Sequence, residues 1–501
     1  MPYLLGYDIG SSSIKASLLN AETGQLVASA SMPKAELSIS APKPGWAEQE
    51  PRTWWKYLKL ATAKLNSKAP TQMKDILAIG ISYQMHGLVI VDKKQRVLRP
   101  SIIWCDSRAV EIGERADREI GHEKCLELFL NSPGNFTASK LKWVMENEPE
   151  IFRKIYKAML PGDYIAMMLT GEIKTTPSGL SEGIFWDFKK GDISSLMMEY
   201  FGFDRNILPD VTPTFSIQGE LTSQAAKALG LHEGIKVAYR AGDQPNNALS
   251  LNVLNPGEIA TTAGTSGVVY GVSDKPVYDK ASRVNTFIHV NHSMDSPRYG
   301  ILSCINGTGI LNRWVKHNLF GAFKRGIDYE EMNEIASHAP AGCDGLFILP
   351  YGNGAERTLD NRDIGASIHG LNFNIHKKEH FLRAVQEGIV FALNYGVEIM
   401  REMGIDVKSV RAGHANMFLS PLFASIFAST TGTTVGLYET DGAQGAARGA
   451  GIGAGYYKNY SDAFLGLKLI KSIEPDPRES EIYSNVYKKW SAILKKEISY
   501  T

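Results

Sequence analysis

Residues 237–270 read VAYRAGDQPNNALSLNVLNPGEIATTAGTSGVVY, and this stretch decides the fold. Its apolar start predicts a short buried strand, Lys236 to Ala238, that runs into the turn 241–245. The glycine of that turn allows a sharp change of direction, and its proline suits the first turn of a helix, expected over 246–254. We therefore expect Asp243 at the rim of a sheet, with its carboxylate directed outward.

The second half of the same stretch predicts a hairpin. Asn255-Pro256-Gly257 ends the helix, Glu258 to Ala263 reads as a strand, and Val268 to Val272 reads as the next one. The turn between them, Gly264-Thr265-Ser266-Gly267, offers backbone N–H groups and two hydroxyls, which suit a phosphate. A carboxylate and a phosphate cradle in one sheet indicate phosphoryl transfer. The plainer interpretation, an Asp that caps a helix and a hairpin that merely turns, stays open on these residues alone.

A similar hairpin begins the chain. Tyr3 to Asp8 reads as a strand, Gly10-Ser11-Ser12-Ser13 as its turn, and Ile14 to Leu19 as the returning strand. Asp8 is suited to hold Mg²⁺ through water, because a hard cation prefers oxygen ligands, and Lys15 adds positive charge; a turn-forming role for Asp8 is the alternative. The two hairpins predict a duplicated unit, one in each half, that would grip a triphosphate from both sides of a cleft.

A third segment has the composition of a pocket for a small polar ligand. The strand expected over 76–82 opens into Gln84-Met85-His86, and the strand expected over 88–92 follows. Trp104 lies shortly after, in a run that also holds an Asp and an Arg. A sugar needs hydrogen-bond partners for its hydroxyls and an apolar wall for its C–H face. The alternative for His86 is a turn histidine that is bonded to the backbone.

Composition bounds the remaining classes. The 501 residues predict two or three domains, and 44% hydrophobic with 21% charged residues is ordinary for a globular protein. Because 54 Lys and Arg stand against 53 Asp and Glu, charge favours neither nucleic acid nor a membrane surface as a partner. No apolar run is long enough to span a membrane, and scattered cysteines suit reduced thiols, so we expect a cytoplasmic location.

The rest of the chain reads as scaffold. Residues 303–317 are expected to form a helix entered through Gly307-Thr308-Gly309. The glycine-rich run 442–455 fits a dinucleotide fingerprint loosely, but no strand immediately precedes it, so we interpret it as a closely packed helix. Residues 478–498 show helical spacing of apolar side chains and predict a docking helix.

The order of these segments resembles the FGGY family of carbohydrate kinases, whose members have the actin-like, Hsp70-like ATPase fold. The match spans nearly the whole chain and is carried by motifs rather than by composition. These motifs are DIGSSSIKA at 8–16, GISYQMHGLVIVD at 80–92, IIWCDSR at 102–108, KLKWVMEN at 140–147, AGD at 241–243, TTAGTSG at 261–267, LPYGNGAERT at 349–358 and GAQGAARGAG at 442–451.

The resemblance implies a role for each matching residue. Asp243 matches the catalytic base, and Asp8 matches the carboxylate associated with Mg²⁺. The sugar would be bound by Met85, His86, Trp104, Asp243 and Gln244. The nucleotide would be bound by Gly10, Ser11, Ser12, Lys15, Gly264, Thr265, Gly309, Gly413 and Asn416, of which Gly413 and Asn416 lie near the adenosine.

Two positions depart from the pattern of the family. Many relatives carry Gly-Asp-Asn where this chain has Gly242-Asp243-Gln244, which changes one substrate contact. The usual Gly-Gly-Gly-Ala turn at the adenosine is here Ala412-Gly413-His414-Ala415, which adds two side chains near the base and bears on nucleotide preference.

The resemblance implies an α/β protein of two actin-like, ribonuclease H-like ATPase domains, 1–250 with the sugar site and 251–501 with the nucleotide site, separated by a cleft. The implied reaction is ATP- and Mg²⁺-dependent phosphorylation of D-xylulose at O5, because QMHG at 84–87 followed by IIWCDSR at 102–108 most resembles the members that act on xylulose. Members that act on glycerol typically carry Arg-Glu in place of Met85-His86. Kinases for ribulose, gluconate, sedoheptulose or glycerol, a non-sugar actin-like ATPase and a silent sugar sensor are the alternatives. A homodimer is compatible with the sequence, which does not decide the oligomeric state.

Overall fold

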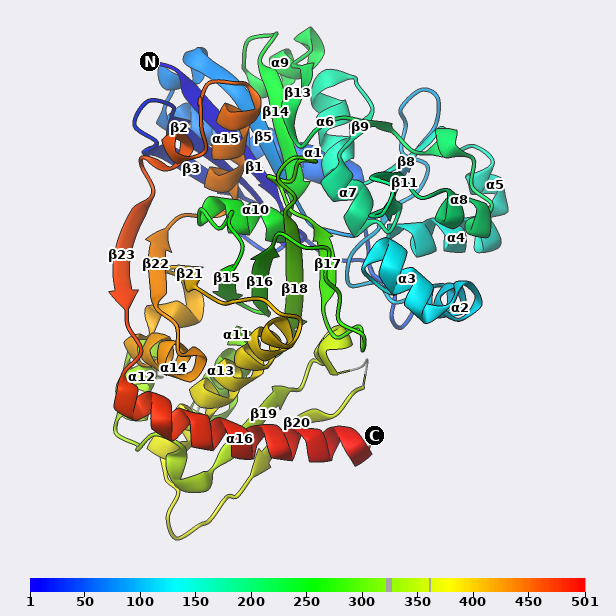
Figure 1. The fold of residues 1–501 in the computed structure, drawn as a ribbon. Helices are drawn as coiled ribbons and strands as arrows, with labels where there is room; N and C mark the ends of the chain where they lie inside the picture. Colours follow the sequence, from blue (N-terminus) through cyan, green and yellow to red (C-terminus); the bar gives the residue numbers. More distant parts are fainter. Residues whose placement is uncertain (321–326, 360–361, 501) are drawn as a thin grey trace. The chain divides into compact units, whose positions relative to one another are not determined.

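The computed structural model describes residues 1–320, 327–359 and 362–500, which form two compact units (Figure 1). Unit 1 consists of Met1–Leu254, Phe287–Tyr299 and Thr440–Leu467, and unit 2 consists of the remaining segments, Asn255–Thr286, Gly300–Glu439 and Lys468–Thr501. The first crossing between the units lies four residues after the expected boundary at 250. The two later returns to unit 1 were not expected, because sequence order does not show which sheet a late helix will cover.

Unit 1 is built on a six-stranded sheet with the order β13-β14-β5-β1-β2-β3. Strands β1, β2 and β3 form an antiparallel meander, as predicted, while β5 and β14 run parallel to β1 and to each other. The bounds are β1 Tyr3–Ile9, β2 Ile14–Asn20, β3 Leu26–Met32, β5 Ile76–Tyr83, β13 Phe215–Glu220 and β14 Lys236–Gly242.

The two faces of this sheet are covered by different helices. Alternate side chains such as Leu5 and Tyr7 join the core under α1 (Pro51–Lys68), whereas Leu4 packs with the alanines of α15 (Gly442–Gly453). A Cβ atom added at Gly6 would lie 1.8 Å from the carbonyl oxygen of Ala443, so α15 approaches the strands as closely as backbones allow. This confirms the interpretation of the glycine-rich run as a packing helix.

Unit 1 also contains smaller strands and helices, which lie outside the six-stranded sheet. Four short strand pairs lie among them: β4 (Glu48–Gln49) with β7 (Ser101–Ile102), β6 (Val89–Val91) with β8 (Lys157–Met159), β9 (Lys174–Thr175) with β12 (Asp210–Val211), and β10 (Trp186–Asp187) with β11 (Asp192–Ile193). The helices are α2 Val110–Ile120, α3 His122–Phe129, α4 Thr137–Asn147, α5 Pro149–Phe152, α6 Pro161–Thr170, α7 Pro177–Glu182, α8 Ser195–Phe201, α9 Ser223–Leu229 and α10 Asp243–Ser250.

Unit 2 repeats the same plan around a seven-stranded sheet, β17-β18-β16-β15-β21-β22-β23. The hairpin β15–β16 is antiparallel, and β21 and β22 continue the sheet in parallel from β15, as β5 and β14 do from β1. This repetition is what the two similar hairpins of the sequence predict. The bounds are β15 Glu258–Ala263, β16 Gly267–Ser273, β17 Asn285–Ile288, β18 Tyr299–Ile305, β21 Ser409–Gly413, β22 Val435–Glu439 and β23 Lys468–Ile473.

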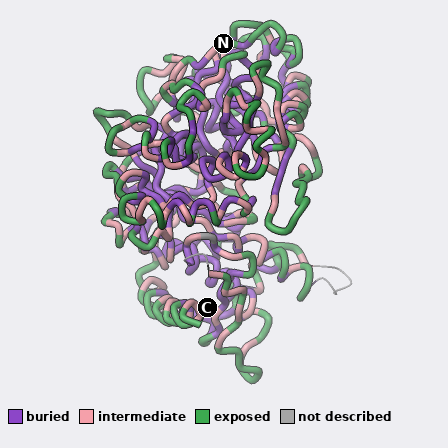
Figure 2. The backbone as a smooth tube through the Cα atoms, turned by 90° about the vertical axis from the view of Figure 1, so that its right-hand side faces the viewer, coloured by how far each residue is buried: buried purple, intermediate pink, exposed green. Residues whose placement is uncertain are grey.

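The core of unit 2 is held by long helices. Trp490 on the docking helix α16 (Pro477–Tyr500) is fully buried, and its indole N–H donates to the carbonyl oxygen of Ile348 over 2.9 Å. Figure 2 shows buried segments inside and exposed segments in the outer loops and helix faces. The other elements are α11 Gly309–Leu319, α12 Tyr329–Ser337, α13 Lys378–Glu402, α14 Pro421–Thr431 and the hairpin of β19 Phe347–Tyr351 with β20 Gly365–His369.

Two expected elements differ from those in the structure. Residues 303–305, expected to be helical, end β18 instead, because this segment is a mostly buried strand with Ile301 and Ile305 in the core. The helix that follows begins at Gly309. Strand β14 also runs four residues further than expected, so that α10 begins at Asp243 itself.

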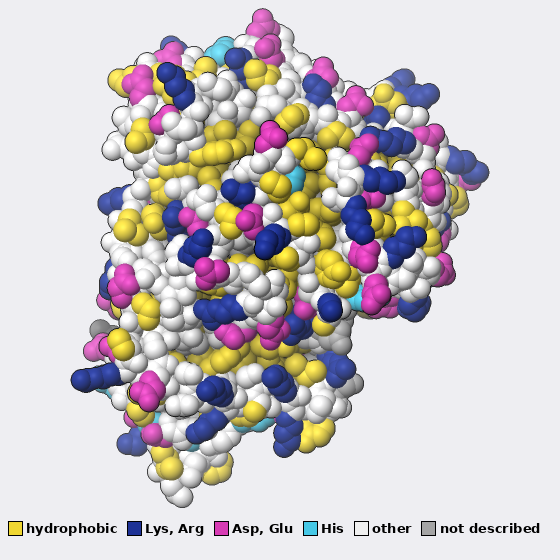
Figure 3. Space-filling model, viewed as in Figure 1, with side chains coloured by type: hydrophobic (Ala, Val, Ile, Leu, Met, Phe, Trp, Pro, Cys, Tyr) yellow, Lys and Arg dark blue, Asp and Glu magenta, His cyan; other side chains and the backbone are white. Residues whose placement is uncertain are grey.

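Charged side chains of both signs are interspersed over the face seen in Figure 3, in keeping with the nearly balanced charge of the chain. Within the described residues, no helix combines the length and the apolar character needed to cross a bilayer.

Candidate active site

Asp243 lies where β14 ends and α10 begins, at the edge of the unit 1 sheet. Its side chain is partly buried. Burial, followed by the charge of Asp8, raises the pKa of Asp243 to about 7, while hydrogen bonds from Gln244 act in the opposite direction. A carboxyl that titrates near neutral pH is suited to accept a proton from a substrate and to release it again.

Asp8, near the end of β1, faces the first turn of α15. Its Oδ1 accepts a hydrogen bond from Ser82 Oγ over 2.9 Å, and a Cβ added at Gly442 would lie 2.6 Å from its Oδ2. Burial raises the pKa of Asp8, the charge of Asp441 adds to that rise, and Lys15, paired with Asp8 across the strands, opposes it. Asp8 therefore interacts electrostatically with both Asp441 and Asp243.

This donor set fits Mg²⁺, which is usually held by one or two carboxylates together with water and substrate phosphates. A divalent cation would offset the repulsion between Asp8 and Asp441. Within the part of the chain that the structure describes, no three His, Cys, Asp or Glu side chains form a complete metal cage. Asn246 joins α10 to α15 by donating from Nδ2 to the carbonyl oxygen of Gly442 over 2.8 Å, next to Asp441.

The hairpin turn between β1 and β2 contains three predicted nucleotide residues. The N–H of Gly10 donates to the carbonyl oxygen of Ser13, which closes the turn. Gln49 Nε2 donates to the carbonyl oxygen of Ser11 over 2.7 Å, and Ser12 is exposed. Trp104, predicted to touch the sugar, points its ring nitrogen at Ser11 Oγ over 3.4 Å and so lies beside this hairpin.

Met85 and His86 lie in the loop after β5. The Met85 side chain is buried against Gly242, where an added Cβ would lie 2.6 Å from Met85 Cγ. His86 has a left-handed backbone, with φ of 59°, and its ring packs between Phe136 and Phe287, whose centroids lie at 4.8 and 5.4 Å. Met85 therefore lies against Gly242, directly before Asp243, although the two belong to separate motifs of the predicted sugar site.

Two hydrogen bonds fix the orientation of His86. Its Nδ1 lies 3.0 Å from the carbonyl oxygen of Glu182, and Lys140 Nζ donates to the carbonyl oxygen of His86 over 2.8 Å. Because a carbonyl oxygen can only accept, Nδ1 carries the hydrogen in this contact.

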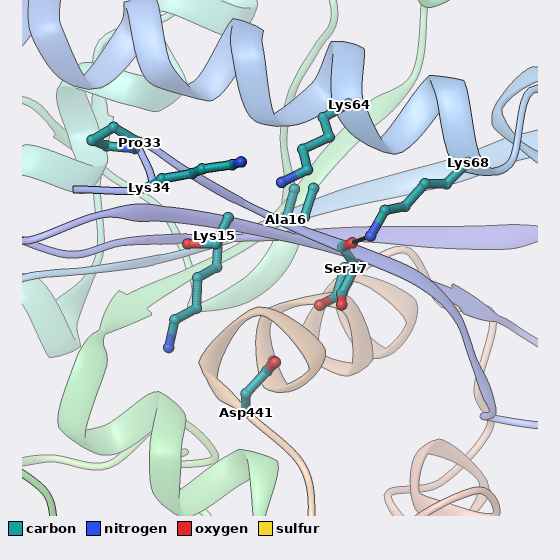
Figure 4. A pocket seen from close by; sticks show the side chains of 11 residues that line it. Lys15, Ala16, Ser17, Pro33, Lys34, Lys64, Lys68 and Asp441 are labelled. Carbon is teal, nitrogen blue, oxygen red and sulfur yellow. Dashed lines mark hydrogen bonds between the residues drawn. The ribbon is translucent and has the colours of Figure 1, made fainter. Parts of the chain in front are cut away.

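A cavity of about 470 Å³ at the β2–β3 edge of unit 1 includes Lys15 among its lining residues (Figure 4). Lys15 points to the α15 side of the strands, as does Asp441, whereas Lys34, Lys64 and Lys68 extend on the α1 side. Lys68 Nζ donates to the carbonyl oxygen of Ser29 over 2.7 Å. The strands thus lie between Lys15 and the other three lysines, and the cavity lining contains no other predicted site residue among those described.

A second cavity, of about 360 Å³, lies wholly in unit 2 and collects four of the predicted nucleotide residues. The N–H of Gly309 and the hydroxyl of Thr308 donate to the carbonyl oxygen of Gly264 over 2.7 and 2.8 Å, which joins the hairpin to the start of α11. Gly413 ends β21 and is not part of the lining. The lining residues are Ala263, Gly264, Thr265, Gly309, Ile310, Asn312, Arg313, Tyr329, Asn333, Asn416, Met417, Leu419 and Ser420.

Several residues of these sites were not singled out from the sequence. Asp441 was missed, although it stands directly before the glycine-rich helix, where a capping carboxylate is common. Tyr329 and Arg313 reach the unit 2 cavity only through helix packing, which leaves no local motif. Glu182 carries no motif at all, and only its burial beside Gly242 reveals it.

Two models of one protein family match the two halves of the chain. The family model "FGGY family of carbohydrate kinases, N-terminal domain" matches residues 3–250, and the corresponding C-terminal domain model matches residues 259–457. The xylulose kinase of Escherichia coli K12 is 31% identical over 81% of this chain and 80% of its own length, and that of Lactococcus lactis is 30% identical over 100% and 98%. The crystal structure of xylulose kinase from Rhodospirillum rubrum, 26% identical, superposes with a TM-score of 0.88 over 99% of both chains.

Proposed function

The chain belongs to the FGGY family of carbohydrate kinases, and from that premise we propose that it transfers the γ-phosphoryl group of ATP to O5 of D-xylulose. As a member, it is a phosphotransferase with an alcohol group as acceptor and ATP as donor. The observation that carries the proposal is the end of β14. There, Asp243 has a pKa near neutrality, Met85 packs against Gly242, and the neighbouring His86 is bonded to Glu182. The curated relatives named as xylulose kinases support the choice of sugar.

In this mechanism Asp243 accepts the proton of the sugar hydroxyl as that oxygen attacks the γ-phosphorus. Base catalysis of this kind contributes about 10²- to 10⁴-fold to the rate. His86 would contact another hydroxyl of the sugar, and Met85 would supply part of the apolar wall. Positioning and electrostatics provide most of the remaining acceleration in phosphoryl transfer.

Each hairpin, taken by itself, offers groups that suit part of a nucleotide. In unit 2, Asn416 and the residues around it would receive the adenosine, and the N–H groups and hydroxyl of Gly264 and Thr265 would receive phosphate oxygens. In unit 1, Gly10, Ser11, Ser12 and Lys15 would receive the phosphate end. Asp8 would hold Mg²⁺ through water, and the ion would neutralise charge on the phosphates.

A coupled assay for ADP formation, run across ketoses, polyols and aldonates, tests this function. We expect ADP to form with D-xylulose and at much lower rates with ribulose, sedoheptulose, gluconate and glycerol. A higher rate with one of those acceptors would reassign the sugar, and ADP formation independent of any acceptor would favour an actin-like ATPase. Because the donor is ATP, we propose that the enzyme works in the cytoplasm.

The pH dependence of kcat/KM should follow the ionisation of Asp243. The carboxyl must be deprotonated to accept a proton, and its pKa is raised to about 7, so kcat/KM should fall about tenfold per pH unit below that value and level off above it. Initial rates with D-xylulose between pH 5 and 9 measure this. An acid limb near the ordinary Asp pKa of about 4 would contradict the role of burial.

Gly309→Val should weaken nucleotide binding selectively. A Cβ atom at this position would lie 2.4 Å from the carbonyl oxygen of Gly264, so the hairpin turn must move away from α11. We expect KM for ATP to rise about tenfold or more, with KM for D-xylulose within about twofold of the parent, since misplacement of about 1 Å can cost 10²-fold. Equal changes in both constants would show that the turn does not serve the nucleotide.

A further inference from the structure

Glu182 contacts both parts of the proposed sugar site from behind. It is the last residue of α7, and its carbonyl oxygen accepts the hydrogen bond from His86 Nδ1. Its side chain packs against Gly242, because a Cβ added at Gly242 would lie 2.9 Å from Glu182 Oε2. One residue thus joins the histidine to the strand end that carries Asp243.

The α7 segment is itself anchored. Thr176 Oγ1 accepts from the N–H of Gly179, which caps the helix at its start. Ser181 Oγ accepts from the N–H of Ile288 over 3.0 Å, and Ser178 Oγ donates to the carbonyl oxygen of Ile288 over 3.0 Å. The backbone of Glu182 is therefore fixed. Its contacts can in turn fix the positions of His86 and Gly242.

The Glu182 carboxyl lies almost wholly out of contact with solvent. The residue is 2% exposed, and its carboxyl interacts with the Tyr83 hydroxyl through a side-chain hydrogen bond. Burial raises the pKa of Glu182 well above its usual value, and Asp243 and Asp163 raise it further, while Tyr83 and Lys140 oppose that rise. Burying a charged carboxylate is costly, so the neutral acid is the favoured form.

The groups that face this carboxyl do not supply a free counter-charge. Arg240 on β14 is paired with Asp163 on α6, with 3.2 Å between Nε and Oδ1. Lys140 on α4 donates to the carbonyl oxygen of His86, and burial lowers its pKa to about 8. Tyr83 on β5 contributes an uncharged hydroxyl that hydrogen-bonds to this carboxyl.

We propose that Glu182 is a positioning residue for the acceptor sugar, which sets the spacing between His86 and Asp243 by the shape of an uncharged side chain. It does not touch the sugar, because its carboxyl oxygens are buried beneath Gly242 and Met85. A second carboxylate beside Asp243 would resist ionisation of the base, so the uncharged form also keeps Asp243 able to act. The inference rests on the proposed function.

Substitutions of Glu182 separate shape from charge. Glu182→Gln keeps the shape without the charge, and we expect kcat, KM for D-xylulose and the midpoint of the acid limb to stay within about twofold or about 0.3 pH unit. Glu182→Ala removes the support under Gly242, and Glu182→Asp shortens it. For both we expect KM for D-xylulose to rise about tenfold or more, with KM for ATP unchanged.

Three outcomes would overturn the proposal. A loss in Glu182→Gln as large as in Glu182→Ala would show that the charge is used, and parental kinetics in Glu182→Ala and Glu182→Asp would show that no positioning occurs. Equal rises in KM for ATP and for D-xylulose would show a distortion that is not confined to the sugar site. If Glu182→Ala does not fold by circular dichroism, the Gln and Asp variants still decide the question.

A matched control is Glu387→Gln in unit 2. This carboxyl is equally buried, but it is bonded to Arg383 and Tyr483 in the core. We expect Glu387→Gln to lower thermal stability and to leave KM for D-xylulose within about twofold. The assays use the parent enzyme with D-xylulose, so an inactive parent would refute the proposed function, whereas an active parent with contrary variants would refute only the role of Glu182.

Discussion

Replacing Asp243 with Asn is expected to lower kcat for D-xylulose phosphorylation by about 10²- to 10⁴-fold. The amide keeps the size of the side chain at the start of α10 but cannot accept the proton of the attacking hydroxyl. Because the interactions that bind the sugar and ATP are retained, both KM values should stay within a fewfold of the parent. The measurement is steady-state kinetics of ADP formation with each substrate varied in turn.

Asp243→Ala provides the comparison. It removes the base and also a side chain that interacts with Gln244, so its kcat should be at least as low, and its KM for the sugar higher. A retained kcat in Asp243→Asn would contradict the assignment of the base. Equal stability of Asp243→Asn and the parent in thermal unfolding would show that any loss is chemical.

Replacing Gly6 with Ala is expected to lower the free energy of unfolding of unit 1 by about 3 kcal/mol or more. The added Cβ would lie 1.8 Å from the carbonyl oxygen of Ala443 and 2.5 Å from the nitrogen of Ala447, so the whole of α15 must move off the sheet. Both contacts are backbone atoms, and a rotamer change cannot relieve them. Calorimetric unfolding of the purified variant measures the loss.

Gly352→Ala is the control for this substitution. The nearest atom to its added Cβ is Ala366 Cβ at 3.3 Å, so we expect a change below about 1 kcal/mol. Because α15 also places Gly442 against Asp8, Gly6→Ala that still folds should lose activity as well. Parental stability and activity in Gly6→Ala would contradict the close packing of α15.

The fold followed from the sequence where local rules and tertiary packing agree. Both hairpins have glycine and hydroxyl residues between apolar strands, and both were predicted nearly to their ends. The helix expected over 303–317 failed at its start because 299–305 is a strand whose burial depends on its neighbours in the sheet. Tertiary packing overrides such ambiguous apolar runs.

The residues of the candidate site likewise fall into those that sequence motifs predicted and those that only the structure shows. Asp243, Asp8, Met85 and His86 stand at strand ends or in turns, where sequence motifs record their positions. Glu182 and Asp441 reach the same region from segments that are far apart in the chain. No motif marks Glu182, and the position of Asp441 before a helix indicates only a cap. Their roles depend on burial and on the charges around them, which only the folded arrangement supplies.

The most direct test of the central claim is the identity of the product. We expect D-xylulose, ATP and the enzyme to yield equimolar ADP and a monophosphate whose ³¹P resonance couples to the C5 protons of the sugar, with no ADP when the sugar is omitted. ADP release that does not depend on D-xylulose, or a phosphate on a different acceptor in its place, would contradict the account.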